Sequence, residues 1–145
     1  MSEVSKVSIT IPSSSEFVGV VRLALSGIAT RMNFSIEEIE DIKIAISEAC
    51  TNAVQHAYPN STGTIEITAL IHEDKLEIEV HDTGTGFHTN VLGSPEQKEK
   101  SEKKLGLGLG LTFIKNLMDE AHVQSEPGKG TTIRMAKRRP TDVLS

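Results

Sequence analysis

The sequence predicts an α+β domain in which helices cover one face of a mostly antiparallel sheet. Two amphipathic helical patterns come early in the chain, and strand-like runs joined by short turns follow in pairs. Separation of helices from paired strands along a chain is typical of α+β layers. The length of 145 residues corresponds to one domain, 1–145, so a single unit is expected to carry the whole function.

The N-terminal part is expected to contain one strand and one helix. Residues 4–11 alternate apolar and polar side chains until Pro12, which predicts a short strand. The serine-rich segment 13–16 resembles a helix N-cap. Apolar residues then recur at intervals of three and four up to about Met32, which predicts an amphipathic helix.

The second helix has the strongest periodic pattern of the chain. Ser35 and Glu38 form a capping-box signature before it, and the Tyr-Pro-Asn segment 58–60 is expected to end it. Cys50, the only cysteine, is expected to be a buried small apolar residue. The apolar face that should pack on the sheet consists of Ile36, Ile39, Ile42, Ile46, Ala49, Ala53 and Ala57.

The rest of the chain is expected to supply most of the sheet. Turn residues at 127–130 predict a hairpin near the end, and residues from about 138 to 145 are expected to be a frayed tail. The expected elements are strands at 64–71 and 76–80, a helix from about 106 to 118, and strands at 121–125 and 131–135.

Composition disfavours several classes of function. Fifteen basic and twenty acidic residues give a net charge of −5, which argues against direct binding of nucleic acid. No apolar run approaches the ~18–20 residues that cross a membrane, so no membrane association is expected. A lone cysteine and the absence of a secretion signal at the N-terminus make the cytoplasm the expected location.

Three groups of residues have patterns that suit nucleotide chemistry. Glu48, Asn52 and His56 form one stripe on the second helix, and carboxylate and amide oxygens suit a hard cation. Asp82 follows a strand and can accept hydrogen bonds from an exocyclic amine. Each group also has a simpler interpretation: a solvated helix face for the stripe, and an ordinary Asp/Gly turn for Asp82-x-Gly84-x-Gly86.

The third group is glycine-rich and opens a helix. Gly106, Gly108 and Gly110 would present backbone N–H groups and a positive helix end to a phosphate. A flexible hinge is the simpler interpretation of the same spacing. The position after a lysine-rich loop excludes the Rossmann fingerprint, which requires its glycines directly after a strand.

Taken together, the order of these motifs resembles that of the Bergerat-fold (GHKL) ATPases, the superfamily of gyrase and the histidine kinases. The resemblance covers roughly residues 5–137 and implies a two-layer α/β sandwich with a mostly antiparallel mixed sheet and helices on one face. The motifs that carry it are Glu48-x-x-x-Asn52, Asp82-x-Gly84-x-Gly86, Gly106-x-Gly108-x-Gly110-Leu111 and Gly128-x-Gly130-Thr131.

Within that superfamily, residues 21–27 and 47–58 closely resemble the anti-sigma-factor serine/threonine-protein kinases. The sigma-B anti-sigma factors of Gram-positive bacteria are the most similar group, with the sporulation anti-sigma factor as a sister group. The resemblance implies a protein that sequesters a sigma factor and uses Mg-ATP to phosphorylate a serine or threonine of an anti-anti-sigma partner. It also implies a homodimer formed through the sheet edge and the first helix.

The resemblance assigns a role to each site residue. Glu48 would accept the proton of the attacking hydroxyl, Asn52 would hold Mg²⁺, and Asp82, supported by Thr131, would receive the adenine amine. Residues 85–105 would form the lid over ATP or ADP, and Arg22 would contact the sigma factor. The remaining nucleotide contacts are assigned to Gly84, Gly86, Lys104, Gly106, Gly108, Gly110 and Leu111.

Other functions remain open on the same motifs. A stressosome-type switch kinase shares the fold but activates a phosphatase, and a non-catalytic module would bind nucleotide only to set its shape. A histidine kinase fragment is disfavoured because no dimerisation helix with a phosphoacceptor histidine precedes the motifs.

Overall fold

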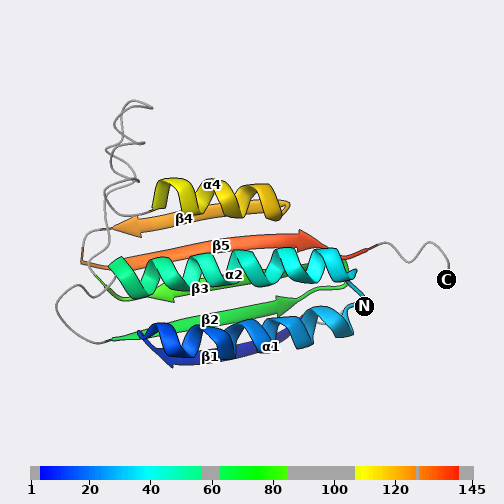
Figure 1. The fold of residues 1–145 in the computed structure, drawn as a ribbon, viewed down its shortest axis with the longest axis horizontal. Coiled ribbons are helices and arrows are strands. Elements are labelled where there is room, and N and C mark those ends of the chain that lie inside the picture. The colour runs from blue at the N-terminus through cyan, green and yellow to red at the C-terminus, as the bar shows by residue number, and fades with distance from the viewer. Residues whose placement is uncertain (1–3, 57–62, 85–106, 127, 141–145) are drawn as a thin grey trace.

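Five strands form one sheet in the order β1-β2-β3-β5-β4 (Figure 1). The computed structural model describes residues 4–56, 63–84, 107–126 and 128–140. Its elements are β1 (Ser5–Pro12), the short 3₁₀ helix η1 (Ser15–Phe17), α1 (Val18–Arg31), α2 (Ile36–His56), β2 (Thr64–Ile71), β3 (Lys75–Asp82), α4 (Leu107–Leu117), β4 (Glu120–Glu126) and β5 (Gly130–Arg138).

All four strand pairings within the described residues are antiparallel. β5 lies between β3 and β4, so the last strand of the chain pairs with β3, although α4 and β4 separate the two in sequence. This register places Asp82 opposite Thr131. The expected α+β architecture is confirmed, but the described strands include no parallel pair that would make the sheet mixed.

The described α-helices α1, α2 and α4 lie together over one face of the sheet (Figure 1). Alternate residues of β3 face them, and Leu76, Ile78 and Val80 are buried. Leu25 of α1 and Ile46 of α2 are also fully buried, and each such side chain stabilises the fold by roughly 1.5–3 kcal/mol. The opposite face of the sheet is polar, because the intervening positions of β3 are lysine, glutamate and histidine.

The two helix starts expected from the sequence have different outcomes. At α2 the capping box forms as expected: the Glu38 N–H donates to Ser35 Oγ at 3.1 Å, and the Ser35 N–H donates to Glu38 Oε1 at 2.9 Å. The serine cap expected before α1 is wrong. Ser14 precedes only the 3₁₀ turn and makes no capping bond with its side chain, and α1 begins at Val18 after Phe17.

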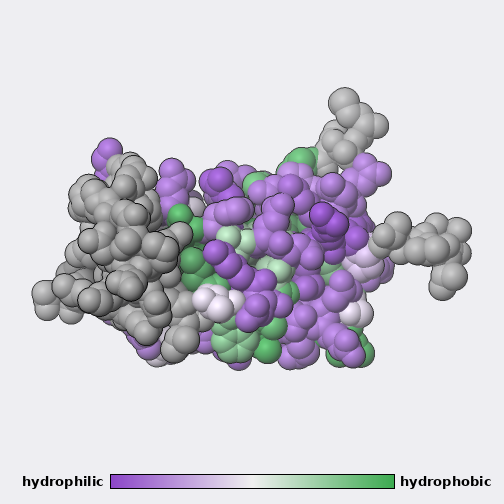
Figure 2. Space-filling view, turned by 90° about the horizontal axis from the view of Figure 1, so that it is seen from above, coloured by the Kyte–Doolittle hydropathy of each residue, from purple (hydrophilic) through white to green (hydrophobic). Residues whose placement is uncertain are grey.

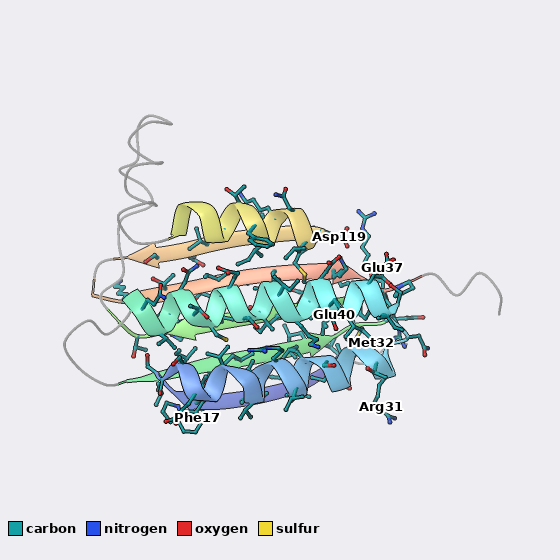
Figure 3. All side chains as sticks on the ribbon, in the orientation of Figure 1. Phe17, Arg31, Met32, Glu37, Glu40 and Asp119 are labelled. Carbon is teal, nitrogen blue, oxygen red and sulfur yellow. The ribbon has the colours of Figure 1, made fainter. Side chains whose placement is uncertain are left out.

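The frayed tail expected from residue 138 is also partly wrong. β5 continues to Arg138, and the ammonium group of Lys137 donates to the Leu117 carbonyl at 2.6 Å, which satisfies the C-terminus of α4. The Arg139 guanidinium donates to the Met32 carbonyl at 3.2 Å. These bonds hold the end of β5 against the C-terminal ends of α4 and α1. Met32 and Asp119 mark this end of the molecule in Figure 3.

The surface on the α4–β4 side is predominantly polar. Viewed from the α4–β4 edge, hydrophilic residues cover most of it, and hydrophobic residues occur in small groups (Figure 2). No helix in the described ranges is long and apolar enough to span a membrane.

Candidate functional site

Asn52 lies on the inner side of α2, toward its C-terminal end, and is only 7% exposed. Within the described residues its side-chain Nδ2 atom is buried and has no hydrogen-bond partner. Burying a polar group without a partner costs about 1–3 kcal/mol. A partner for this atom would have to come from outside the described residues.

The start of α4 packs directly against this asparagine. A Cβ atom placed on Gly110 would lie 2.6 Å from Asn52 Nδ2 and 3.5 Å from Glu48 Oε2. Glu48, one helical turn before Asn52, is half-buried and points toward the same place. The interpretation of this stripe as a solvated helix face is therefore wrong at Asn52, because α4 covers it.

The glycines of the third group open α4 as expected. Gly108 and Gly110 lie in its first turn, where backbone N–H groups lack intrahelical partners and can face an anion. The Leu111 side chain is buried in the hydrophobic core, so only its main chain is available to a nucleotide. Gly86, Gly106, Lys104 and the expected lid at 85–105 lie outside the described residues, and their roles stay predictions.

Asp82 ends β3 at the helix-covered side of the sheet and is 6% exposed. Its Oδ1 atom accepts a hydrogen bond of 2.9 Å from the Gly84 N–H, so the Asp-x-Gly turn forms and also orients the carboxyl group. Burial raises the pKa of Asp82 above its ordinary value of 3.8. Bonds from the backbone N–H groups of Gly84 and Thr131, and the nearby His81, lower it by a smaller amount.

A second glycine lets β5 approach the backbone of Asp82 and Thr83 closely. Gly130 has a φ of +87°, and a Cβ atom there would collide with the carbonyl oxygen of Asp82 and lie 2.8 Å from Thr83 Cα. Only glycine fits both the backbone angle and the space. The next residue, Thr131, is thereby held opposite Asp82 in the β3–β5 register, as the expected adenine contact requires.

The sequence interpretation missed Ser125, which completes this group. It is 2% exposed, and its hydroxyl lies 2.8 Å from Thr131 Oγ1 and donates to the Gly130 carbonyl at 3.1 Å. The alternation of Ala121, Val123 and Ser125 along β4 is the signal that could have revealed it, since it places a serine on a buried face.

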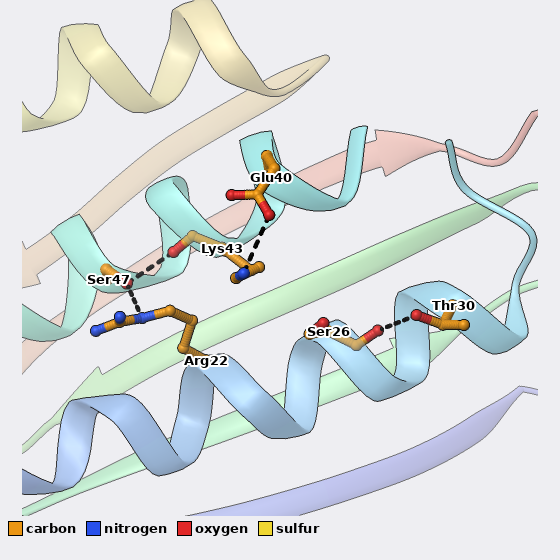
Figure 4. Close-up of polar contacts among 6 residues, drawn as sticks. All are labelled: Arg22, Ser26, Thr30, Glu40, Lys43 and Ser47. Carbon is orange, nitrogen blue, oxygen red and sulfur yellow. Dashed lines mark hydrogen bonds and ion pairs between the residues drawn. The ribbon is translucent and has the colours of Figure 1, made fainter. Parts of the chain in front are cut away.

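Arg22 lies beside a groove between α1 and α2 rather than projecting freely. Its Nε–H donates to Ser47 Oγ at 3.1 Å, and the Ser47 hydroxyl donates to the Lys43 carbonyl at 2.7 Å (Figure 4). The groove has a volume of about 350 Å³ and reaches the proposed catalytic residue. Its lining residues are Arg22, Glu40, Lys43, Ile44, Ser47 and Glu48.

Comparison with known proteins shows which family this chain resembles. Residues 11–137 match the family model of the histidine kinase-like ATPase domain. A serine-protein kinase RsbW from Bacillus licheniformis is 46% identical over 87% of this chain and 81% of the relative. The protein of the same name from Bacillus cereus is 43% identical over 94% of this chain and 87% of the relative.

A solved structure shares the fold. The crystal structure of the RsbU and RsbW domains of a Mycobacterium tuberculosis protein superposes with a TM-score of 0.68 at 24% sequence identity. The match covers 94% of this chain but 34% of the longer M. tuberculosis chain.

Fold and site together define an ATP-binding domain of the histidine kinase-like class. The chain belongs to this ATPase domain family, in the branch of the RsbW serine-protein kinases. The family expected from the motif order is therefore confirmed.

Proposed function

We propose that this protein is an anti-sigma factor with protein kinase activity. It binds Mg-ATP, transfers the γ-phosphoryl group to a serine or threonine of an anti-anti-sigma partner, and withholds a sigma factor from RNA polymerase in the cytoplasm. The observation that supports this most directly is the meeting of Glu48 and Asn52 at Gly110. A proton acceptor, a cation ligand and a phosphate-binding helix start thereby lie together.

The adenine end of the proposed site is the pair Asp82 and Thr131. An ionised Asp82 accepts a hydrogen bond from the exocyclic amine of adenine, and the Gly84 N–H holds the carboxylate in place. Gly130 brings β5 close enough for Thr131 to take part in recognising the same edge of the base.

The phosphate end is built from Asn52 and the first turn of α4. Rotation of an amide by 180° exchanges its oxygen and nitrogen, so the buried end of Asn52 that lacks a partner is suited to an oxygen ligand for Mg²⁺. When bound, the cation neutralises charge on the phosphate oxygens. Backbone N–H groups around Gly108 and Gly110 bind phosphate oxygens from the helix side.

Glu48 performs the acid–base part of the reaction. Its carboxylate accepts the proton of the substrate hydroxyl while that oxygen forms a bond to the γ-phosphorus. The bond from the γ-phosphorus to the bridging oxygen breaks, and ADP leaves. Phosphoryl transfer depends mainly on positioning and charge neutralisation, so few side chains are required.

The groove beside Glu48 is suited to the protein partner. It leads from Glu40 along α2 to the proposed catalytic carboxylate, and Arg22 lies at its wall. We place the phosphoacceptor segment in this groove and assign Arg22 to the contact with the sigma factor.

Substitution Arg22→Glu should weaken sigma binding by about 10-fold or more, because like charges at an interface cost several kcal/mol. Unchanged affinity would remove Arg22 from that contact.

A homodimer through β1 and α1 is part of the proposal. β1 is an edge strand whose outer backbone groups have no strand partner among the described residues, and α1 lies at the same edge (Figure 1). Val20 and Leu23 on α1 are 53% and 75% exposed. Light scattering should give twice the chain mass for the wild type and a smaller species for Leu23→Asp.

The kinase reaction is tested with the purified chain, Mg-ATP and an anti-anti-sigma domain. Glu48→Gln should slow phosphoryl transfer by about 100-fold or more, since a general base contributes roughly 10²–10⁴ in rate, while ATP affinity changes little. Glu37→Gln, exposed near the N-terminal end of the same helix, is the matched control and should transfer phosphate normally (Figure 3). Wild-type rates for Glu48→Gln would contradict the assigned base.

Pull-down experiments separate the alternative functions. Capture of a sigma factor supports the anti-sigma role, whereas activation of a phosphatase without sigma capture would indicate a switch kinase. ATP binding and sigma capture without any phosphate transfer would indicate a non-catalytic module.

A further inference from the structure

Ser125 lies behind the proposed adenine contact and is almost completely buried. It faces Thr131 across the β4–β5 pair, and their hydroxyl oxygens are 2.8 Å apart. The Ser125 hydroxyl also donates to the Gly130 carbonyl at 3.1 Å. On distance alone, either hydroxyl could donate in the contact between them.

The single proton of each hydroxyl group is used to assign the donor of this contact. A carbonyl oxygen can only accept, so the bond to Gly130 uses the single hydroxyl proton of Ser125. With that proton at the Gly130 carbonyl, we assign Thr131 as the donor and Ser125 as the acceptor of the 2.8 Å contact. With its only hydroxyl proton directed at Ser125, Thr131 Oγ1 presents only lone pairs to its other neighbours.

A second hydrogen-bond acceptor lies on the same face of the sheet as Thr131. Asp82 lies opposite Thr131 on β3, and the Thr131 backbone N–H helps to stabilise its ionised carboxyl group. We propose that Ser125 is a positioning residue that keeps the Thr131 hydroxyl an acceptor and thereby makes the site select a base with an amine over one with a carbonyl at the same position. This inference rests on the proposed assignment of Asp82 and Thr131 to the adenine.

The selectivity follows from hydrogen-bond polarity. The 6-amino group of adenine donates to both acceptors, directly or through a water molecule. The 6-oxo group of hypoxanthine or guanine also accepts, so it faces two acceptors and loses its hydrogen bonds to water without replacement. A site with a fixed polarity rejects such an analogue far more strongly than an apolar pocket does.

Binding of ATP and ITP tests the idea, because ITP carries a 6-oxo group in place of the 6-amino group and, with it, a proton on N1. Affinities are measured by competition against a fluorescent ATP analogue for the wild type and Ser125→Ala. Loss of the serine acceptor frees the Thr131 proton to reach a 6-oxo group. The ratio of the Kd for ITP to the Kd for ATP should therefore fall by about 10-fold, the usual effect of one hydrogen bond. Thr132→Val, on the opposite face of the sheet and bonded to His81, is the matched control and should leave the ratio unchanged.

A double substitution distinguishes positioning from general damage. In a Thr131→Val background, Ser125→Ala should no longer change the ratio, because no hydroxyl remains to be oriented. If Ser125→Ala folds poorly, Ser125→Cys keeps nearly the same volume with a weaker acceptor and should shift the ratio in the same direction.

The outcomes separate this inference from the proposed function. A ratio within twofold of wild type in Ser125→Ala or Ser125→Cys, with ATP still bound, overturns the role of Ser125 alone. Wild-type protein that binds neither nucleotide overturns the ATP site itself.

Discussion

Asn52 and Gly110 are in such close contact that a side chain at residue 110 would displace the Asn52 amide. A single added carbon there would lie 2.6 Å from Asn52 Nδ2. The contact joins the helix that carries Glu48 to the helix start that is proposed to bind phosphate. The glycine therefore serves the packing of two helices at the site as well as the approach of a ligand to the backbone.

Gly110→Ala should impair the site although alanine is the better helix former. Overpacking costs roughly 1–3 kcal/mol, and relief requires Asn52 or α4 to move. We expect the affinity for Mg-ATP to fall by about 10-fold or more, as measured by calorimetry.

Gly27→Ala is the control for this prediction. Gly27 is exposed within α1, and a Cβ atom there would have no neighbour within 4 Å. The change should raise the free energy of unfolding by about 0.5–1 kcal/mol through helix propensity and leave ATP affinity unchanged. Equal ATP affinities in the two alanine variants would refute the packing argument.

Asp82→Asn should weaken ATP binding by about 10- to 100-fold, because a hydrogen bond to a charged acceptor contributes roughly 1.5–3 kcal/mol. ATP affinity of the wild type should also fall on acidification, since the raised pKa of Asp82 causes the carboxylate to be protonated at a higher pH than an exposed aspartate. Calorimetric titrations across pH measure both effects.

The same raised pKa predicts the opposite trend for stability. Folded Asp82 binds a proton more readily than unfolded Asp82, so its stabilising contribution is present below the ordinary value of 3.8 and is lost as pH rises through the folded pKa. The free energy of unfolding of the wild type relative to Asp82→Asn should therefore increase as pH falls through that window. A difference that is constant with pH would contradict the assigned cause.

Ser47→Ala should release Arg22 from the wall of the groove. One hydrogen bond of 3.1 Å is lost, and we expect sigma-factor affinity to fall by about 3- to 10-fold while ATP affinity is retained. Ser26→Ala is the control, because Ser26 contacts Thr30 through its backbone carbonyl (Figure 4). Equal sigma affinities for the two variants would show that Ser47 does not position Arg22.

Lys137→Met should destabilise the fold without touching the site. The ammonium group donates to the Leu117 carbonyl and lies 3.8 Å from the Asp41 carboxylate, with its side chain 12% exposed. Leaving these acceptors unpaired should lower the free energy of unfolding by about 1–3 kcal/mol in urea titrations. Lys115→Met, on the exposed side of α4, should change it by less than about 0.5 kcal/mol.

Most elements of the fold were predictable because their signals are local. The periodicity of α2 and its Ser35–Glu38 capping box depend on neighbouring residues, and both are present as expected. The end of β5 was not predictable in this way. The sequence predicted that Arg138 and Arg139 belong to a frayed tail. Partners on distant segments keep this end in the fold, and one of them is the Met32 carbonyl.

The sequence alone determined the motif order, and with it the family and the chemical type of each site residue. It could not decide between a solvated and a buried Asn52, because that depends on where α4 packs, more than fifty residues further along the chain. The alternation along β4 could place Ser125 on a buried face, but its contact with Thr131 arises from the pairing of β4 with β5 and of β5 with β3. Tertiary structure decided these points because burial and hydrogen-bond direction depend on neighbours in space rather than in sequence.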